Sequence, residues 1–415
     1  MIKATAEDVI IIGAGVVGLT LAHGLKKHGI PFQIYERDSS VSARGQGWAI
    51  TIHWALPYLK DLLSPETLAE IDEVQVDPEI GRKDTGNFLF INLSNCETKY
   101  RIPPSERRRV NREKLRAVLL RDVASKVHWS KSVSSVESTD NGVKVTFDDG
   151  TSTRGSLVVG ADGANSRVRR FLRPDDYRNS QLPIRFLGSA VDMTPAQVAP
   201  LRKLDPLLFQ GCHPESSCFM WVSMLETPAV NGTAENEPDK QRYRVQLNLS
   251  WPVRSPADEP APTDKERVAD MKRRADVFAP VLRDAIHAIP DDAEVLEIKL
   301  ADWPCLDWDN SKGRITLVGD AAHAMTMYRG EAANHGMLDA YRLVESLKVL
   351  HSVNADSEVG AVDEQSRVVT DFEAEMRTRT SYAVKMSRQA CFDAHDWERL
   401  NENSAVLTKR AVVAK

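Results

Sequence analysis

The chain has 415 residues, of which 42% are hydrophobic and 27% charged, and its formal net charge is −5. This length predicts two domains, or one large domain with insertions, and the mixed charges exclude the strongly basic surface of a nucleic-acid-binding protein. No run of residues reaches the roughly 18 apolar positions of a membrane-spanning helix. The five cysteines are scattered and form no Cys-x-x-Cys pair, so we expect reduced thiols in a cytoplasmic protein, without a disulfide framework or a metal site.

The chain opens with a strand, a glycine-rich turn, a helix and a second strand. Residues 8–12 form an apolar run that is typical of a buried parallel strand. Residues 16–28 carry apolar side chains at helical spacing, and residues 32–36 predict the second strand. This order predicts a βαβ unit.

The turn after the first strand reads Gly-Ala-Gly-Val-Val-Gly at residues 13–18. Gly13 allows a tight bend, Gly15 lets a pyrophosphate approach the backbone, and Gly18 lets the helix pack closely on the strand. The start of the helix adds N–H donors and the positive end of its dipole. The same spacing occurs in ordinary turns, but the flanking strand and helix favour a dinucleotide site.

An acidic residue stands where a bound dinucleotide needs one. Glu36 ends the second strand, 18 residues after Gly18, where it would accept hydrogen bonds from a ribose and repel a 2′-phosphate. We therefore expect FAD or NAD rather than NADP, with Val17 and Arg37 as further contacts. No second GxGxxG occurs, so either NAD is the sole cofactor, or FAD is bound and NAD(P)H visits without a domain of its own.

The middle of the chain changes character. Residues 86–102 predict a pair of strands, and residues 111–126 predict a helix with Asn111 as its N-cap. Several strand-like runs separated by loops occupy residues 184–252, which predicts an antiparallel sheet. A charged helix is expected over residues 264–288.

The parallel pattern resumes near the end of the chain. Residues 314–318 predict a strand that ends at Gly319, and helices are expected over residues 333–350 and 364–390. The nucleotide domain is therefore expected to be discontinuous, with the substrate sheet inserted into it. The expected boundaries are 1–80, 103–182 and 305–363 for the nucleotide domain, 81–102 and 183–304 for the substrate domain, and 364–415 for a C-terminal helical segment.

Two further motifs point to a family. Residues 160–169 read Gly-Ala-Asp-Gly-Ala-Asn-Ser-Arg-Val-Arg, and residues 319–323 read Gly-Asp-Ala-Ala-His. With the first glycine motif they resemble, over nearly the whole chain, the FAD-dependent aromatic hydroxylases of the p-hydroxybenzoate hydroxylase fold (group A flavoprotein monooxygenases), in particular fungal members. The resemblance implies an α/β fold with a GR2-type, Rossmann-like FAD-binding domain, an inserted and mostly antiparallel substrate sheet, and C-terminal helices.

The resemblance also assigns cofactor contacts. Asp162 and Gly163 match a pair implicated in binding both FAD and NAD(P)H, and Asp320, after Gly319, matches an aspartate at the FAD ribityl or ribose region. Asp320 also follows a strand, where open α/β sheets bind ligands, although a lone Gly-Asp often only caps a turn.

Two arginines match family positions. Arg44 resembles an arginine near the FAD phosphates, and Arg112 resembles one that braces the cofactor. A guanidinium suits a pyrophosphate because its donors form a fork, whereas the alternative for each residue is a solvated surface arginine.

In the family, the turn after the third motif runs along the flavin ring. The small residues Gly330, Ala332 and Ala333 would let backbone N–H groups approach the ring, and the helix that follows would stabilise a reduced, anionic flavin. The sequence departs from the family at two positions, with Met327 in place of Pro and Ala332 in place of Gly. Both changes leave FAD binding possible, and Ala332 would be strained if its φ had to be positive.

The resemblance implies a monooxygenase with tightly but non-covalently bound FAD. NADPH or NADH would reduce FAD, O₂ would give a flavin hydroperoxide, and its distal oxygen would hydroxylate or epoxidise a small aromatic, polyketide-type or alkaloid-type secondary metabolite. The expected protein is a monomer or homodimer. The other reactions left open are Baeyer–Villiger oxygenation or reduction on the same fold, an NAD-dependent dehydrogenase, and a non-catalytic flavin-binding protein.

The sequence does not fix the catalytic residues. Tyr328 and His53 are candidates for a general base, together with Tyr100 and His213, and Arg329 is a candidate for holding an anionic substrate. Packing or a surface position is the alternative for each of them.

Overall fold

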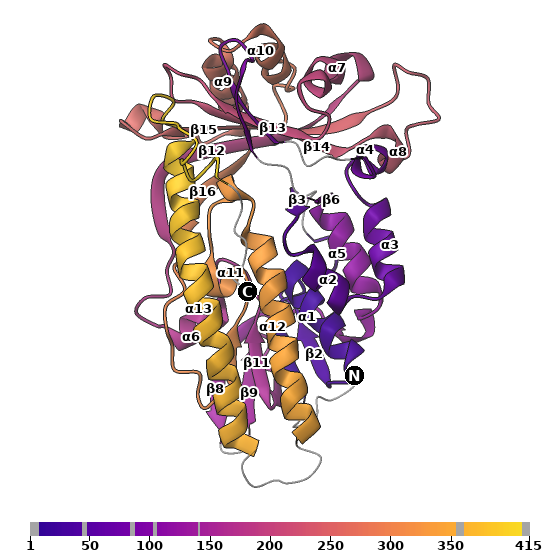
Figure 1. Cartoon of the computed structure of the whole chain (residues 1–415), viewed down its shortest axis with the longest axis vertical. Coiled ribbons are helices and arrows are strands. Elements are labelled where there is room, and N and C mark those ends of the chain that lie inside the picture. Colours follow the sequence, from indigo (N-terminus) through magenta and orange to yellow (C-terminus); the bar gives the residue numbers. More distant parts are fainter. Residues whose placement is uncertain are drawn as a thin grey trace.

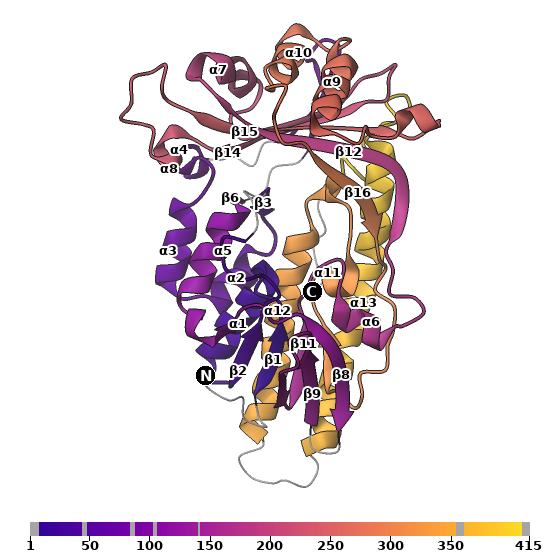
Figure 2. The ribbon, with the colours of Figure 1, turned by 180° about the vertical axis from the view of Figure 1, so that it is seen from behind.

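The computed structural model describes residues 8–43, 48–83, 88–102, 106–139, 142–353 and 361–408. Two sheets divide the molecule into a lower body and an upper layer (Figures 1 and 2). The sheet of the lower body is parallel and has the strand order β17-β11-β1-β2-β7. Its strands are β1 (Val9–Ile12), β2 (Phe32–Tyr35), β7 (Val127–His128), β11 (Leu157–Gly160) and β17 (Ile315–Leu317).

The lower sheet is apolar because both of its faces are covered. All residues of β1, β2, β11 and β17 are buried, as expected for a parallel sheet with helices or a second sheet on each side. Helix α1 (Val16–Lys27) packs against α5 (Arg112–Arg121) and α12 (Ala332–Val353). A three-stranded sheet adjoins the lower sheet and consists of β8 (Val133–Thr139), β9 (Gly142–Phe147) and β10 (Ser152–Gly155).

The upper sheet has the strand order β16-β12-β15-β14-β13-β4-β5, and the pairing of β4 with β13 is parallel while the other pairs are antiparallel. Helices α7 (Pro195–Leu204), α9 (Asp264–Ala275) and α10 (Pro280–His287) cover its outer face (Figure 1). Its strands are β4 (Phe88–Asn92), β5 (Thr98–Ile102), β12 (Ser180–Met193), β13 (Leu208–Cys212), β14 (Phe219–Glu226), β15 (Tyr243–Pro252) and β16 (Leu296–Asp302).

The short antiparallel pair of β3 (Ala49–Ile52) and β6 (Arg108–Asn111) lies between the two sheets (Figures 1 and 2). It contacts β14 above, and β6 runs directly into α5 below. The remaining helices are α2 (Leu56–Leu62), α3 (Pro65–Glu73), α4 (Pro78–Gly81), α6 (Arg167–Leu172), α8 (Pro228–Asn231), α11 (Asp320–His323) and α13 (Ala361–Asp393), with 3₁₀ turns η1 (Ala124–Lys126), η2 (Pro256–Asp258) and η3 (Met327–Arg329).

The sequence-based elements agree with the structure except at two places. Asn111 is the N-cap of α5, since its side chain accepts hydrogen bonds from the N–H groups of Glu113 and Lys114, but α5 ends at Arg121 and a 3₁₀ turn replaces its expected last turn. The single helix expected over 264–288 is wrong. Pro280 has no N–H to continue a helix and disfavours helical geometry at the residue before it, so α9 ends at Ala275 and α10 begins anew at Pro280.

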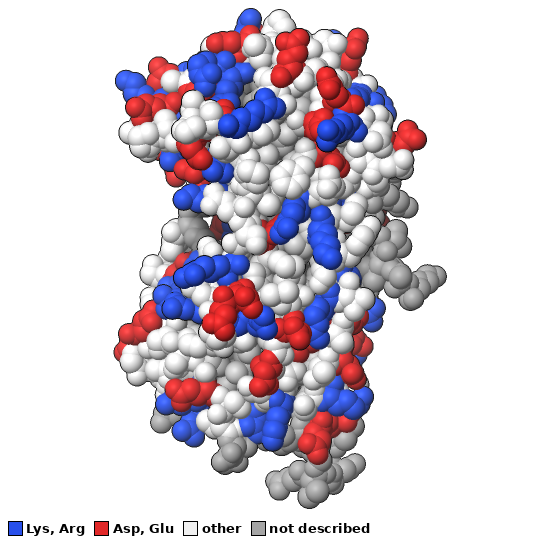
Figure 3. Space-filling view, turned by 90° about the vertical axis from the view of Figure 1, so that its left-hand side faces the viewer, with Lys and Arg blue, Asp and Glu red and all other residues white. Residues whose placement is uncertain are grey.

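Positive and negative side chains are interspersed over the face shown in Figure 3, from the upper layer to the lower body. Among the helices that the structure describes, none is long and apolar enough to cross a membrane. We retain the domain boundaries as a proposal, which the origin of the upper strands in residues 88–102 and 180–302 supports.

Candidate cofactor and substrate site

Close backbone contacts bring the three sequence motifs together. A Cβ atom at Gly13, whose φ is +112°, would lie 2.5 Å from the carbonyl oxygen of Ala161, so the turns after β1 and β11 touch. Val17 packs against the third motif, because Cβ atoms at Gly319 and Gly336 would lie 3.1 and 2.4 Å from its Cγ2. All three turns therefore meet at the carboxyl ends of adjacent parallel strands, where open α/β sheets bind ligands.

The remaining glycines of the first motif differ in their surroundings. A Cβ at Gly18 would lie 2.2 Å from the carbonyl oxygen of Gly13, so this position keeps α1 close to the strand. A Cβ at Gly15 would meet no atom within 4 Å. Because Gly15 borders a cavity, this open space is available to a ligand that approaches the backbone.

A cavity of about 520 Å³ begins at these turns and continues to the upper sheet. The predicted cofactor contacts that border it are Gly13, Gly15, Val17, Glu36, Arg37, Arg112, Asp162, Gly163, Asp320, Gly330, Ala332 and Ala333. Gly18 and Gly319 lie behind this lining, where they support the turns. Arg44 lies outside the described residues.

Glu36 supports the first turn from the end of β2. Its Oε2 accepts a hydrogen bond from the N–H of Ala14 at 2.7 Å, and its Oε1 accepts one from the backbone N–H of Asp38 at 3.0 Å. The side chain is 3% exposed and borders the cavity. A carboxylate here can accept hydroxyl groups of a ribose and repels a second negative charge.

Asp162 has two different carboxylate oxygens. Its Oδ2 accepts hydrogen bonds from the N–H groups of Arg167 at 2.6 Å and Val168 at 3.3 Å, so it caps α6. Its Oδ1 is buried without a hydrogen-bond partner, and burial raises the pKa of the carboxyl group. Asp162 therefore uses one carboxylate oxygen to cap the turn, and the other remains available beside the cavity.

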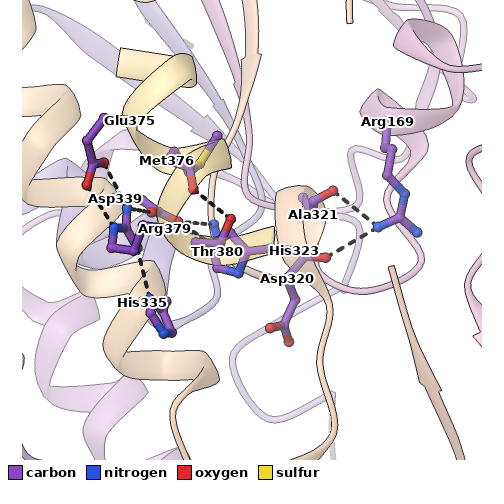
Figure 4. A network of polar contacts seen from close by, with 11 residues as sticks. Arg169, Asp320, Ala321, His323, His335, Asp339, Glu375, Met376, Arg379 and Thr380 are labelled. Atoms are coloured by element: carbon purple, nitrogen blue, oxygen red, sulfur yellow. Dashed lines mark hydrogen bonds and ion pairs between the residues drawn. The ribbon is translucent and has the colours of Figure 1, made fainter. Parts of the chain in front are cut away.

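Asp320 presents its carboxylate to the cavity while its backbone is fixed from behind. Nη1 of Arg169 donates to the carbonyl oxygens of Asp320 at 3.3 Å and Ala321 at 3.1 Å. In Figure 4 the carboxylate points away from Arg169 and His323. It borders the cavity, and burial raises its pKa.

A buried ionic network holds the third turn in place (Figure 4). Asp339 on α12 accepts hydrogen bonds from the N–H of Gly319 at 2.8 Å and from Nε2 of His323 at 2.6 Å. It also pairs with Arg379 of α13 at 2.8 Å. Although burial acts to raise it, the partners His323 and Arg379 hold the pKa of Asp339 below its usual range. The network joins two long helices to the turn that carries Asp320.

The flavin-facing turn of the family corresponds here to the residues before α12. Gly330 has a φ of +64°, which favours glycine. Ala332 begins the 22-residue helix α12 and is not among the non-glycine residues of positive φ, so the strain considered for it does not arise. Ala332 and Ala333 border the cavity, which places the positive end of the α12 dipole beside it.

None of the five catalytic candidates borders the cavity, and three of them, Tyr328, Arg329 and His53, lie behind this turn. Tyr328 is fully buried and donates to Oγ of Ser250 at 2.8 Å. Arg329 pairs with Glu331 at 2.6 Å and also donates to the carbonyl oxygen of Ala405. These contacts indicate that both residues anchor the loop and the C-terminal segment rather than touch a substrate.

His53 is tied to the same turn. Its N–H donates to Oδ1 of Asn334 at 2.9 Å, and its Nε2 lies 3.4 Å from the carbonyl oxygen of Gly330. Its position favours a role in holding the turn. Within the described ranges, no three His, Cys, Asp or Glu side chains gather into a group that could hold a metal ion.

Sequence analysis missed most of the upper lining of the cavity. Apolar residues alternate with Gln246 and Asn248 on β15. The apolar side chains pack under the outer helices, and the polar ones face the cavity. This alternation was the sequence signal that could have identified the lining residues. The missed residues are Trp48, Arg109, Phe186, Gln246, Asn248, Ile298 and Met325.

The chain is similar to known proteins both in sequence and in fold. The family described as FAD binding domain matches residues 6–360. The FAD-dependent monooxygenase dbaB of Emericella nidulans is 47% identical over 344 residues, covering 82% of this chain and 86% of its own. The FAD-dependent monooxygenase tazP of Aspergillus terreus is 37% identical, covering 83% and 90%.

Solved structures agree in fold at low sequence identity. HpxO of Klebsiella pneumoniae, crystallised with FAD and uric acid, gives a TM-score of 0.72 at 20% identity and covers 94% of this chain and 90% of its own. The 2,6-dihydroxypyridine-3-hydroxylase of Arthrobacter nicotinovorans gives 0.73 at 15%, covering 100% and 99%. The lower part of the cavity, with its glycine turns and open acceptor oxygens, fits FAD. The chain therefore belongs to the FAD-binding family of flavoprotein monooxygenases, and FAD is its cofactor.

Proposed function

We propose that this protein uses NADPH or NADH and O₂ to hydroxylate or epoxidise a small aromatic or polyketide-type secondary metabolite. One observation carries the proposal: a single cavity runs from the dinucleotide turns to an upper lining rich in aromatic side chains. FAD, when bound and reduced, supplies the oxygen-activating chemistry. The protein holds the cofactor and the substrate at the two ends of this space and excludes water between them.

Individual residues have distinct tasks in this proposal. Glu36 and Asp320 accept hydroxyl groups of the ribose and ribityl chain, and Arg112 binds the pyrophosphate through its fork of donors. The first N–H groups of α12, at Ala332 and Ala333, stabilise negative charge on the flavin ring. His53 keeps the turn in position through its contact with Gly330.

The nicotinamide nucleotide binds only transiently, because the sequence contains no second dinucleotide motif.

The test begins with the purified protein, which should carry the visible absorption of bound FAD. NADPH and NADH are then added under air, with and without a panel of phenolic and polyketide-like compounds. We expect one of them to accelerate nucleotide oxidation and to gain one oxygen atom by mass spectrometry.

The same experiment separates the other reactions of this fold. A product that gains two hydrogen atoms would identify a reductase, and conversion of a ketone to an ester would identify a Baeyer–Villiger oxygenase. Nucleotide oxidation that no compound accelerates would favour a non-catalytic flavin-binding protein. A dehydrogenase with NAD as its only cofactor is excluded, because the chain belongs to a family that binds FAD. A cytoplasmic monomer or homodimer stays a prediction.

A further inference from the structure

Arg109, on strand β6, borders the upper end of the cavity. Its side chain donates from Nη1 to Oγ1 of Thr51 at 2.8 Å and from Nη2 to Oγ of Ser223 at 2.7 Å. The residue is 5% exposed, and its Nε is buried without a hydrogen-bond partner. Two neutral hydroxyl groups thus fix the guanidinium, and its Nε–H has no partner.

Unlike Arg329 and Arg379, Arg109 has no carboxylate partner among the described residues. Arg329 pairs with Glu331 and Arg379 pairs with Asp339. No ion pair involves Arg109 within the part of the chain that the structure describes. Burial and the neighbouring charge of Arg107 lower the pKa of Arg109 to about 9. A buried cation without an anion is costly, so this end of the cavity attracts negative charge.

Aromatic rings line the same cavity as Arg109. The guanidinium carbon lies 5.8 Å from the ring centre of Trp221. Trp48 meets Phe186 edge to face at 5.8 Å, and all three rings border the cavity. Flat apolar walls of this kind suit a planar ring system.

Asn248 supplies a second unused polar group. Its Nδ2 donates to the carbonyl oxygen of Trp221 at 3.2 Å. Since a carbonyl oxygen only accepts, the amide orientation is fixed and Oδ1 faces elsewhere. That oxygen is buried without a partner, in a residue that is 1% exposed and borders the cavity. It is suited to accept a hydrogen bond from a ligand hydroxyl.

We propose that Arg109 is a specificity-determining residue that binds an anionic oxygen of a planar aromatic substrate, either a carboxylate or an ionised phenol or enol. Asn248 then accepts a hydrogen bond from a hydroxyl group on the same ring system. The assignment of this end to the substrate rests on the proposed function. Arg112 is separate from this role because it borders the cofactor end and interacts with Asp320.

The test measures binding alone, by titration calorimetry on the FAD-loaded protein without nicotinamide nucleotide. The probes are 2-naphthoate and 2,4-dinitro-1-naphtholate, each compared with its neutral counterpart, 2-naphthamide and the methyl ether of the dinitronaphthol. A charged hydrogen bond contributes about 1.5–3 kcal/mol, so we expect at least one anion to bind about tenfold or more tightly than its counterpart. Preference for one anion distinguishes a carboxylate from a phenolate or enolate ligand.

Two substitutions at Arg109 and one control define the role of the guanidinium. Arg109→Gln should abolish the preference for the anion while keeping the affinity for the neutral compound, and Arg109→Lys should keep part of the preference because it retains charge without the fork. The control is Arg108→Gln on the same strand, which removes a cation that already pairs with Asp72. It should leave all affinities unchanged.

The FAD absorption spectrum of each variant shows whether the fold is kept. If Arg109→Gln fails to fold, Arg109→Lys decides, since unchanged anion preference in that variant would contradict recognition by the guanidinium. The proposal is overturned if the parent protein binds neither anion, or if Arg109→Gln retains the preference. A failure of the oxygenase proposal looks different: the anions bind, but the nucleotide oxidation assay finds no oxygenated product.

Discussion

The two ends of the cavity are built in different ways. The cofactor end consists mainly of turns at the carboxyl ends of parallel strands, where Gly13, Gly15 and Gly163 expose the backbone. The upper end, which we propose as the substrate end, consists of side chains from the mostly antiparallel upper sheet and from β6, such as Trp221, Asn248 and Arg109. The first end is therefore defined by backbone geometry and the second by the chemistry of individual side chains.

This difference suits the ligands that we propose for the two ends. A dinucleotide always presents the same phosphates and sugars, so backbone N–H groups and helix starts at fixed positions are sufficient. An antiparallel strand alternates its side chains between two faces, so residues facing the cavity can change while those under the outer helices keep the sheet packed. Substitutions at the two ends should accordingly fail in different ways.

The largest expected effect separates packing from ligand approach within the first motif. Gly18→Val would place atoms against the carbonyl oxygen of Gly13, where even a Cβ would lie at 2.2 Å. We expect a loss of about 4 kcal/mol or more in the free energy of unfolding, and loss of FAD. Thermal unfolding followed by circular dichroism measures the first, and the flavin content of the purified protein measures the second.

Gly15→Ala is the matched variant, because a Cβ there meets no protein atom within 4 Å. Its apoprotein should unfold like the parent, while its affinity for FAD falls by about tenfold or more, since the methyl group occupies the space that the pyrophosphate needs. Equal FAD affinity in this variant and the parent would show that the cofactor does not approach the backbone at Gly15.

Substitutions in the loop between the two ends should change the free energy of unfolding. Arg329→Met leaves Glu331 buried without its 2.6 Å partner, which we expect to cost about 3–5 kcal/mol. The double variant Arg329→Met/Glu331→Leu removes both charges and should recover much of that loss. Urea unfolding measures both. A stable Arg329→Met protein with impaired substrate binding would instead return Arg329 to the substrate site.

The side-chain part of the cofactor end is tested at Asp320. Asp320→Asn keeps the volume and removes the charge, so the hydrogen bonds accepted by the carboxylate weaken. We expect FAD to bind about tenfold to hundredfold more weakly, or about 1.4–2.7 kcal/mol, with an unchanged fold. Equilibrium titration of the apoprotein with FAD measures the change, and unaltered affinity would remove Asp320 from the cofactor site.

The smallest expected effect is a pH dependence at His335, in the network behind the third turn. Burial and the nearby Arg379 lower the pKa of His335 to about 3, against 6.5 for an unperturbed histidine. Because the folded pKa is depressed, its stabilising contribution is complete above pH 6.5 and declines as the pH falls toward 3. At pH 6 the loss should be about 1 kcal/mol.

His335→Gln removes this titration while keeping an acceptor for the hydrogen bond from Arg379, which spans 2.9 Å to Nδ1. Urea unfolding of the parent and the variant between pH 7 and pH 6 provides the comparison. The variant should show the shallower decline. The pKa of Asp339 nearby is held below its usual range, so this group does not titrate in the window and equal slopes would contradict the assignment to His335.

Part of the fold could be predicted because the signal was local. The βαβ opening, the N-cap at Asn111 and the helix that begins near residue 333 each depend on spacing or on residues within one turn. The break before Pro280 was also a local signal and was overlooked. Tyr328 and Arg329 were predicted as catalytic candidates because of their neighbours in the sequence. Their contacts in the structure, with Ser250 and Ala405, come from distant segments.

The sequence by itself determined that a dinucleotide binds and which part of the fold is parallel, since a glycine turn and the strand before it are specified by contiguous residues. FAD rather than NAD followed from the resemblance of three motifs to a family. Only the tertiary structure decided which side chains face the substrate end, because β6, β14 and β15 are brought together by pairing and packing between segments far apart in the chain. The exposure of Arg109 to a cavity and its lack of a carboxylate partner are properties of that assembly. No local pattern encodes them, because burial and charge pairing depend on all the segments that surround a side chain.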